Sequence, residues 1–162
     1  MRIRIILFIV LGVVYVNTTV KAQIQLMPSA NVLISDATAF GAGSISGRYF
    51  VSPHIATGVN VRYIPTTRIA MATLEADYFF NLGKSIRPFL GFEAGVFSRY
   101  EGAAYTNPGI APKVGLQKKL SSLMGLQLEI SYPTIIRKGQ RFEGSSAFQA
   151  GVGLNFSIGN DK

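Results

Sequence analysis

The sequence predicts an all-β protein, a closed eight-stranded antiparallel up-and-down β-barrel that crosses a membrane with its strands. Three observations predict this fold class. Apolar and polar residues alternate with a period of two after residue 22, where we find no amphipathic helix with a 3.6-residue period. Charged residues are 15% of the chain, against about 25% in soluble domains, and the mean hydropathy is +0.30. No apolar run in that part approaches the roughly 18 residues of a transmembrane helix, so a closed barrel is the main remaining way to span a bilayer.

The first 22 residues have the features of a secretory signal peptide. Two arginines precede an apolar run over residues 5–16, and Val20 and Ala22 stand where a signal peptidase reads small or apolar residues. We therefore expect residues 1–22 to be cleaved and residues 23–162 to form one outer-membrane barrel domain. A permanent N-terminal anchor is the alternative, although the run is short for a spanning helix.

Composition and charge exclude several kinds of site. The chain has no cysteine, so disulfides, a lipid-modified cysteine and thiolate metal sites cannot form. Three of its 16 lysines and arginines lie in the expected signal peptide, which leaves 13 basic against 8 acidic residues, a net charge of +5. The basic residues fall near both ends of the predicted strands, where we expect them to meet the phosphates of outer-membrane lipid and lipopolysaccharide. They form no single aromatic-interleaved stripe, so nucleic acid is not an expected partner.

Turn residues divide the chain after residue 22 into eight predicted strands. They are Ile24–Ile34, Thr38–Val51, Ile55–Ile64, Ile69–Phe80, Arg87–Arg99, Gly109–Lys119, Leu123–Tyr132 and Phe148–Ser157. Connections after the second, fourth and sixth strands are short, and those after the fifth and seventh are longer, so we expect the short turns on the periplasmic side. An even number of strands places both termini at that side.

The individual strands differ in how regular their patterns are. The second, "AFGAGSISGRYF", carries three glycines on the face predicted to point outward, so a bulge could shift its orientation. In the third, every second residue from Ile55 to Tyr63 belongs to the apolar face. In the fourth, Leu74 and its apolar neighbours oppose Thr73 and two acidic residues. The fifth, "RPFLGFEAGVFSRY", has an apolar residue or proline at every second position from Pro88. The seventh and eighth alternate in the same way, and the first and sixth are the alternating segments between turns.

The mid-strand charges decide which face points outward. Placing Arg62 and Lys113 toward lipid near the bilayer centre would cost about 2 to 4 kcal/mol each. We therefore expect these charges inside, where they pair to offset their desolvation, as a lumen network of Arg48, Arg62, Glu75, Asp77, Glu93, Lys113 and Glu129. The wider set predicted to point inward adds Asn60, Gln117, Gln127, Gln149 and Asn155. A narrow ion path along this network is the alternative interpretation.

Aromatic residues concentrate toward the strand ends, as the interfacial girdles of membrane barrels do. The residues expected to form girdles are Tyr49, Phe50, Tyr63, Tyr78, Phe79, Phe80, Phe97, Tyr100, Tyr132, Phe148 and Phe156. The β-propensity of aromatic residues would explain their presence but not their position.

Three segments resemble the small outer-membrane β-barrel domains of Gram-negative bacteria, the family around outer membrane protein A and the OmpX and OmpW types. They are "RYFVSPHIATGVNVRY", "DYFFNLGKSIRPFLGFEAGVFSRY" and "QAGVGLNFSIG", and the piece from Phe80 through Gly95 is the most family-like. The resemblance covers essentially the whole chain after residue 22 and implies insertion in the cell outer membrane. It also implies a C-terminal signal for the barrel-assembly machinery at Gln149, Gly151, Leu154 and Phe156, although "SIGNDK" follows here where family members often end.

No catalytic residues, metal site or cofactor are expected. Some barrels of this family are lipid-modifying enzymes that use a histidine with a serine and an acid. The single histidine here, His54, lies in a predicted periplasmic turn, away from an outer-leaflet substrate. One histidine without cysteines predicts no metal site, and "GAGSISG" lies in a strand pattern and opens no helix, so it is not a phosphate-binding loop.

The loop "PTIIRKGQRFEGSSA" is the expected place for an extracellular partner, whose identity the sequence does not indicate. The interaction candidates are Arg137, Lys138, Arg141 and Phe142. We expect a non-enzymatic integral outer-membrane barrel with a structural or surface-interaction role. The alternatives are a narrow pore or carrier for small solutes, and a soluble periplasmic lipocalin-like binding barrel, which would be apolar inside but should carry many more exterior lysines and glutamates.

Overall fold

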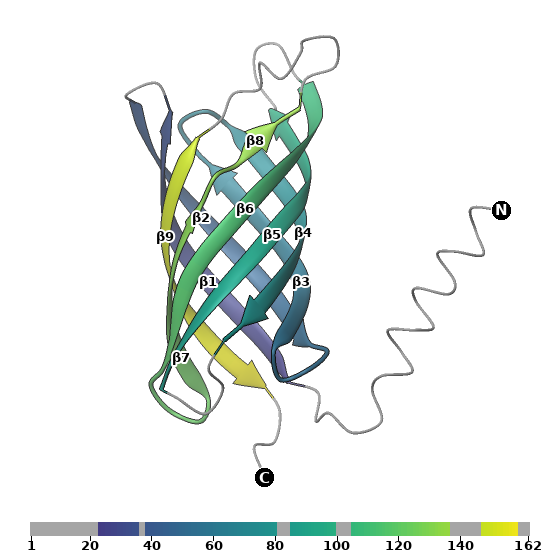
Figure 1. Ribbon diagram of the computed structural model, residues 1–162. Coiled ribbons are helices and arrows are strands. Elements are labelled where there is room, and N and C mark those ends of the chain that lie inside the picture. Colours follow the sequence, from purple (N-terminus) through teal and green to yellow (C-terminus); the bar gives the residue numbers. More distant parts are fainter. Residues whose placement is uncertain (1–22, 36–37, 81–84, 100–104, 137–146, 159–162) are drawn as a thin grey trace, which may run out of the picture.

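The computed structural model describes residues 23–35, 38–80, 85–99, 105–136 and 147–158. They form one antiparallel sheet that curves round and closes on itself, as Figure 1 shows. Its strands are β1 (Ile24–Ser35), β2 (Thr38–Phe50), β3 (Ile55–Ile64), β4 (Ile69–Phe79), β5 (Ile86–Arg99), β6 (Tyr105–Lys119), β7 (Met124–Ser131), β8 (Thr134–Ile135) and β9 (Phe148–Ile158). Pairing of β1 with β9, and of β5 with β6, completes the ring. The predicted all-β class and closed antiparallel barrel are confirmed.

Strands β7 and β8 are two parts of one barrel strand. Both pair with β6 in a single register, in which Lys113 pairs with Ser131 and Ile110 pairs with Thr134. Pro133 stands between them and has no N–H to donate to the ladder. The barrel wall therefore has eight strands, as predicted, and the seventh extends beyond its expected end at Tyr132.

The two ends of the barrel differ. Strand β1 begins and β9 ends at the lower end in Figure 1, where Ile24 pairs with Ile158. The connections from β2 to β3 and from β6 to β7 lie at this end, which we call the turn end. Strand β8 lies at the opposite end, the loop end. Among the described residues, no helix is long and apolar enough to cross a membrane.

Two details of the strand prediction change. Strand β6 begins at Tyr105 and not at Gly109, because its ladder with β5 continues until Arg99 pairs with Tyr105. Part of the expected long loop after the fifth strand is therefore sheet. The register of β2 with β1 runs without a break from Tyr49 to Thr38, so the bulge considered for the glycine-rich second strand does not occur.

The outer surface is apolar and the lumen holds the polar side chains. On β4, Leu74 is 68% exposed, whereas its neighbours Thr73 and Glu75 are 6% and 3% exposed. Pro28 on β1 and Leu90 on β5 are likewise exposed, and the residues on either side of each are less exposed. The prediction that the apolar face points outward and the mid-strand charges point inward is confirmed.

Inward glycines make room for large side chains on neighbouring strands. A Cβ on Gly91 would overlap the Asp77 carboxylate and approach Lys113 Cε to 2.7 Å. A Cβ on Gly115 would lie 2.5 Å from the Phe89 ring and overlap the Leu128 carbonyl oxygen. Glycine at these positions is therefore part of the packing of the lumen.

Substituting Gly115 by alanine should lower the free energy of unfolding by about 1 to 3 kcal/mol, because the added methyl group overpacks the Phe89 ring and a backbone oxygen. Gly41→Ala is the matched control, since a Cβ there meets nothing within 4 Å. Urea unfolding in lipid vesicles, followed by the mobility of unheated samples on gels, measures both. Equal losses in the two variants would contradict the packing role of Gly115.

Candidate functional site

Arg48 lies at the centre of the buried lumen network. Its Nε is 3.0 Å from Glu75 Oε1 and 3.1 Å from Asp77 Oδ2, both on β4. Its Nη1 donates a 2.6 Å hydrogen bond to Gln127 Oε1, and its Nη2 lies 3.8 Å from Glu129 Oε2, both on β7. Because β2 neighbours neither β4 nor β7 in the sheet, Arg48 reaches across the lumen and joins separate parts of the wall.

Lys113 extends the network from β6. Its Nζ contacts Glu75 Oε2 and lies 3.1 Å from Asp77 Oδ1 and 3.5 Å from Glu93 Oε1. Glu75 is therefore shared by two cations, Arg48 on one side and Lys113 on the other. A carboxylate held between two cations cannot turn toward a passing ion without losing both partners.

Glu93 on β5 collects a second group of donors nearer the loop end. Arg62 Nη2 lies 3.5 Å from Glu93 Oε1, and Asn60 Nδ2 donates to the same oxygen at 3.3 Å. Thr73 Oγ1 donates a 3.2 Å hydrogen bond to Glu93 Oε2. Together with Lys113, these contacts link the two groups of charges into one continuous network.

The seven charged residues of the lumen network are all at most 8% exposed. Three are cations and four are carboxylates, so nearly every charge has an opposite partner, which offsets its desolvation. A pair 4 Å apart is worth about 4 kcal/mol at intermediate dielectric. Separating several such pairs at once is therefore costly, and the arrangement favours a filled lumen over an open path.

An aromatic layer stands on one side of the lumen near the turn end. Phe79 packs between Phe50 and Phe89, with ring centroids 5.3 and 5.2 Å away, and all three are at most 4% exposed. The Arg87 guanidinium lies 5.2 Å from the Phe79 ring centre, and that of Arg48 lies 5.6 Å from the Phe89 ring centre. The layer thus packs against cations through cation–π contacts.

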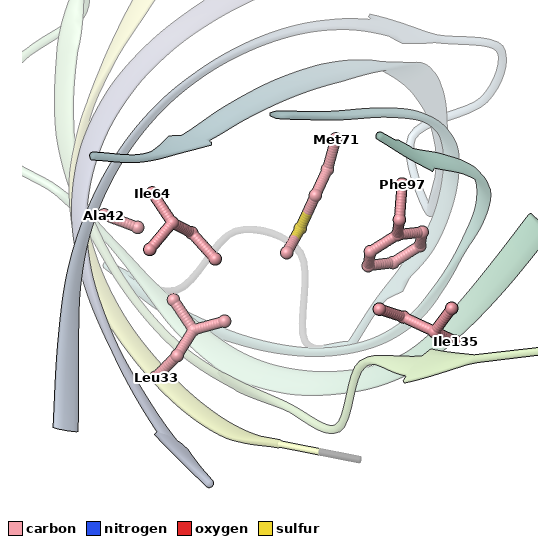
Figure 2. Close-up of a cluster of buried hydrophobic side chains, with 6 residues drawn as sticks. All are labelled: Leu33, Ala42, Ile64, Met71, Phe97 and Ile135. Carbon is pink, nitrogen blue, oxygen red and sulfur yellow. The ribbon is translucent and has the colours of Figure 1, made fainter. Parts of the chain in front are cut away.

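A cluster of apolar side chains, which we call the apolar cap, lies in the lumen at the loop end. Figure 2 shows its side chains pointing inward from the wall: Leu33, Ala42, Ile64, Met71, Phe97 and Ile135. They come from β1, β2, β3, β4, β5 and β8, and each is at most 8% exposed. Phe40, Ile69 and Ala147 pack against them. The lumen therefore changes from charged to apolar before it reaches the loops.

The expectation that Phe50, Phe79 and Phe97 belong to interfacial girdles is wrong, because all three point into the lumen. The signal that identifies them was present in the sequence. Phe50 lies two residues from Arg48, and Phe79 lies two residues from Asp77, so each shares the inward face of its charged neighbour. Other predicted girdle residues do face outward: Tyr63, Tyr78, Phe80, Tyr132, Phe148 and Phe156.

The remaining predicted site residues are placed as follows. Gln149 is buried and donates a 3.1 Å hydrogen bond to Asn31 Oδ1, Gly151 packs against the same Asn31, and Leu154 and Phe156 face outward. The other inward candidates, Gln117 and Asn155, are buried toward the turn end. The loop candidates Arg137, Lys138, Arg141 and Phe142 lie outside the described residues, as does Tyr100.

His54 lies in the exposed connection between β2 and β3. Its ring stacks on Tyr78, with centroids 5.7 Å apart, and its Nδ1 is 3.0 Å from the Phe79 carbonyl oxygen. In the described part of the chain, no three side chains of the metal-binding types are grouped to hold an ion.

The comparisons with known proteins agree on the fold. No model of a known protein family and no curated protein matches the sequence. Among solved structures, the N-terminal β-barrel domain of Pseudomonas aeruginosa OprF is similar with a TM-score of 0.65 and 12% identity, over 84% of this chain and 97% of that one. Neisserial surface protein A is similar with a TM-score of 0.58 and 14% identity, over 86% and 97%. The outer membrane enzyme PagL is similar with a TM-score of 0.51 and 11% identity, over 82% and 99%. The expected fold of the small outer-membrane barrels is thus confirmed.

Proposed function

We propose that this chain is an integral outer-membrane β-barrel with a structural or surface-interaction role and with a lumen closed by its own side chains. The observation that carries the proposal is the order of layers inside the barrel, in which the charged network lies beneath an apolar cap. An outer surface of exposed leucines, valines and isoleucines supports the membrane location. The likeness in fold to outer-membrane barrels supports it as well.

The soluble lipocalin-like alternative does not fit these faces. A soluble binding barrel keeps its apolar side chains inside and presents charges to water. Here the arrangement is reversed, with Arg48 and Glu75 buried in the lumen and Leu74 exposed outside. Leaving such a surface in water would promote association, since soluble monomers rarely expose large continuous apolar patches.

The proposal treats the chain as non-enzymatic. The single histidine lies on an exposed turn, and its Nδ1 lies within hydrogen-bonding distance of a backbone oxygen. Within the described residues, the buried carboxylates of the lumen pair with cations and lie beneath the apolar cap. Because the enzyme PagL has a similar fold, the fold by itself does not decide this question, and the assignment rests on the chemistry of the side chains.

Three kinds of partner are part of the proposal. Outer-membrane lipid and lipopolysaccharide would contact the apolar wall and its basic ends, and the barrel-assembly machinery would read the last strand during insertion. The loop after β8 remains the proposed contact with an extracellular partner. Purified outer-membrane fractions, together with the unheated mobility of the protein on gels, would test the location.

The purified protein in a planar lipid bilayer should show no stable conductance steps, because the apolar cap and the lumen network fill the cross-section. Glu75→Ala and Arg62→Ala, measured in parallel, should stay silent, since the cap is intact in both. Regular steps from the unmodified protein would contradict the closed lumen and favour the alternative of a narrow pore or carrier.

A further inference from the structure

A polar cavity of about 590 Å³ opens at the turn end of the lumen, beside the aromatic layer. Its wall includes the side-chain amides of Gln25, Gln117 and Asn155, several serines, and the cations Arg87 and Lys119. None of the described residues that line it is acidic. Its volume lies in the range of about 300 to 1,000 Å³ that small-molecule sites occupy, and its lining is more polar than is usual for such sites.

A row of hydrogen bonds organises one wall of this cavity. Arg87 donates to Gln117 Oε1, and Gln117 Nε2 donates a 3.0 Å hydrogen bond to Gln25 Oε1. Gln25 Nε2 in turn donates to Ser157 Oγ at 3.3 Å. The row runs from β5 through β6 and β1 to β9. Because each donor points the same way and the row starts at a cation, the wall is fixed in one orientation before any ligand arrives.

The buried side chain of Asn155 is a separate indication that the cavity holds a ligand. It is 1% exposed and lines the cavity, yet neither its side-chain oxygen nor its nitrogen has a hydrogen-bond partner in the structure. A buried amide left without partners costs about 1 to 3 kcal/mol. A molecule in the cavity that both donates and accepts hydrogen bonds would satisfy it.

We propose that this cavity binds a small anionic molecule rich in hydroxyl groups, namely a sugar that carries a carboxylate or a phosphate. The anionic group would approach Arg87 and Lys119, since charge-assisted hydrogen bonds to an anion are roughly twice as strong as neutral ones. The hydroxyl groups match the amides and serines, which can each donate or accept. Two cations and no carboxylate stand among the described lining residues, which favours an anion over a cation. This site lies at the opposite end from the loops and is separate from the proposed surface role.

The binding test uses the folded barrel in detergent micelles at low ionic strength, titrated calorimetrically with glucuronate, glucose 6-phosphate and glucose. At least one of the two anions should bind about tenfold or more tightly than glucose, and the better of the two identifies the anionic group. No binding of either anion, or equal binding of all three sugars, would overturn the proposal.

Adjacent lysines on β6 provide matched variants. Both are exposed, but Lys119 lines the cavity and Lys118 does not. Lys119→Gln should weaken binding of the preferred anion about fivefold or more, because it removes one charge-assisted contact, and Lys118→Gln should change it less than twofold. Equal weakening in both variants would indicate a general charge effect and would overturn the assigned site. Because the measurement is made in micelles, it is independent of where the protein resides in the cell.

Discussion

Replacing Arg48 by methionine is expected to lower the free energy of unfolding by about 3 to 5 kcal/mol, the largest single effect among these predictions. Methionine fills much of the space, but it leaves Glu129 buried without the arginine that lies within 4 Å of it, and it leaves Glu75 and Asp77 with Lys113 as their shared cation. A buried charge without a partner costs more than the pair contributed, because its desolvation is no longer offset. Urea unfolding in lipid vesicles, read from the mobility of folded and unfolded protein on unheated gels, measures the change. The chain has no tryptophan, so tyrosine fluorescence is the optical alternative.

Two further variants separate charge from packing at this position. Adding Glu75→Gln to Arg48→Met should restore part of the lost stability, since it removes one of the four carboxylates that then face only two cations and leaves Lys113 to Asp77 and Glu93. Arg68→Met removes an arginine from the exposed connection between β3 and β4 and should change the free energy by no more than about 0.5 kcal/mol. If the double variant is less stable than Arg48→Met alone, the loss does not come from the excess of buried negative charge.

Replacing Leu74 by arginine should lower the free energy of unfolding in lipid vesicles by about 2 to 4 kcal/mol. Leu74 is 68% exposed on the outer face, midway along β4, where it would meet the centre of the hydrocarbon. The arginine would lose its hydration there and would find no carboxylate, because the acidic residues of β4 point to the other side. The change is measured by the same urea titration.

Leu123→Arg is the control for this substitution. Leu123 is also exposed, at 62%, but it lies in the turn between β6 and β7, where an arginine can reach the interface. The expected loss is only about 0 to 1 kcal/mol. If both substitutions were tolerated equally, the outer face would not be in contact with lipid, and the proposed membrane location would fail.

The candidate site could be predicted only in part from the sequence. Alternation identified the residues that point inward, including Arg48 and Glu129. It could not identify their partners, because Arg48 and Gln127 are 79 positions apart and meet only when β2 and β7 face each other across the closed lumen. The same limit applies to the packing partners of Phe50 and Phe79, although alternation could have shown that both point inward. Their place near the strand ends suggested girdles, and only their positions around the lumen show that they pack on each other and on Arg87.

By itself the sequence determined that this protein has two faces, how its eight wall strands are divided, and which face carries the charges. The physical reason is local, since a period of two places successive side chains on opposite sides of any strand, whatever its neighbours are. Tertiary structure alone decided how the inside is layered, with the apolar cap at the loop end, the charges in the middle, and the aromatic layer and polar cavity at the turn end. Those layers depend on strand register and on closure of the sheet, which bring together residues that no local pattern connects.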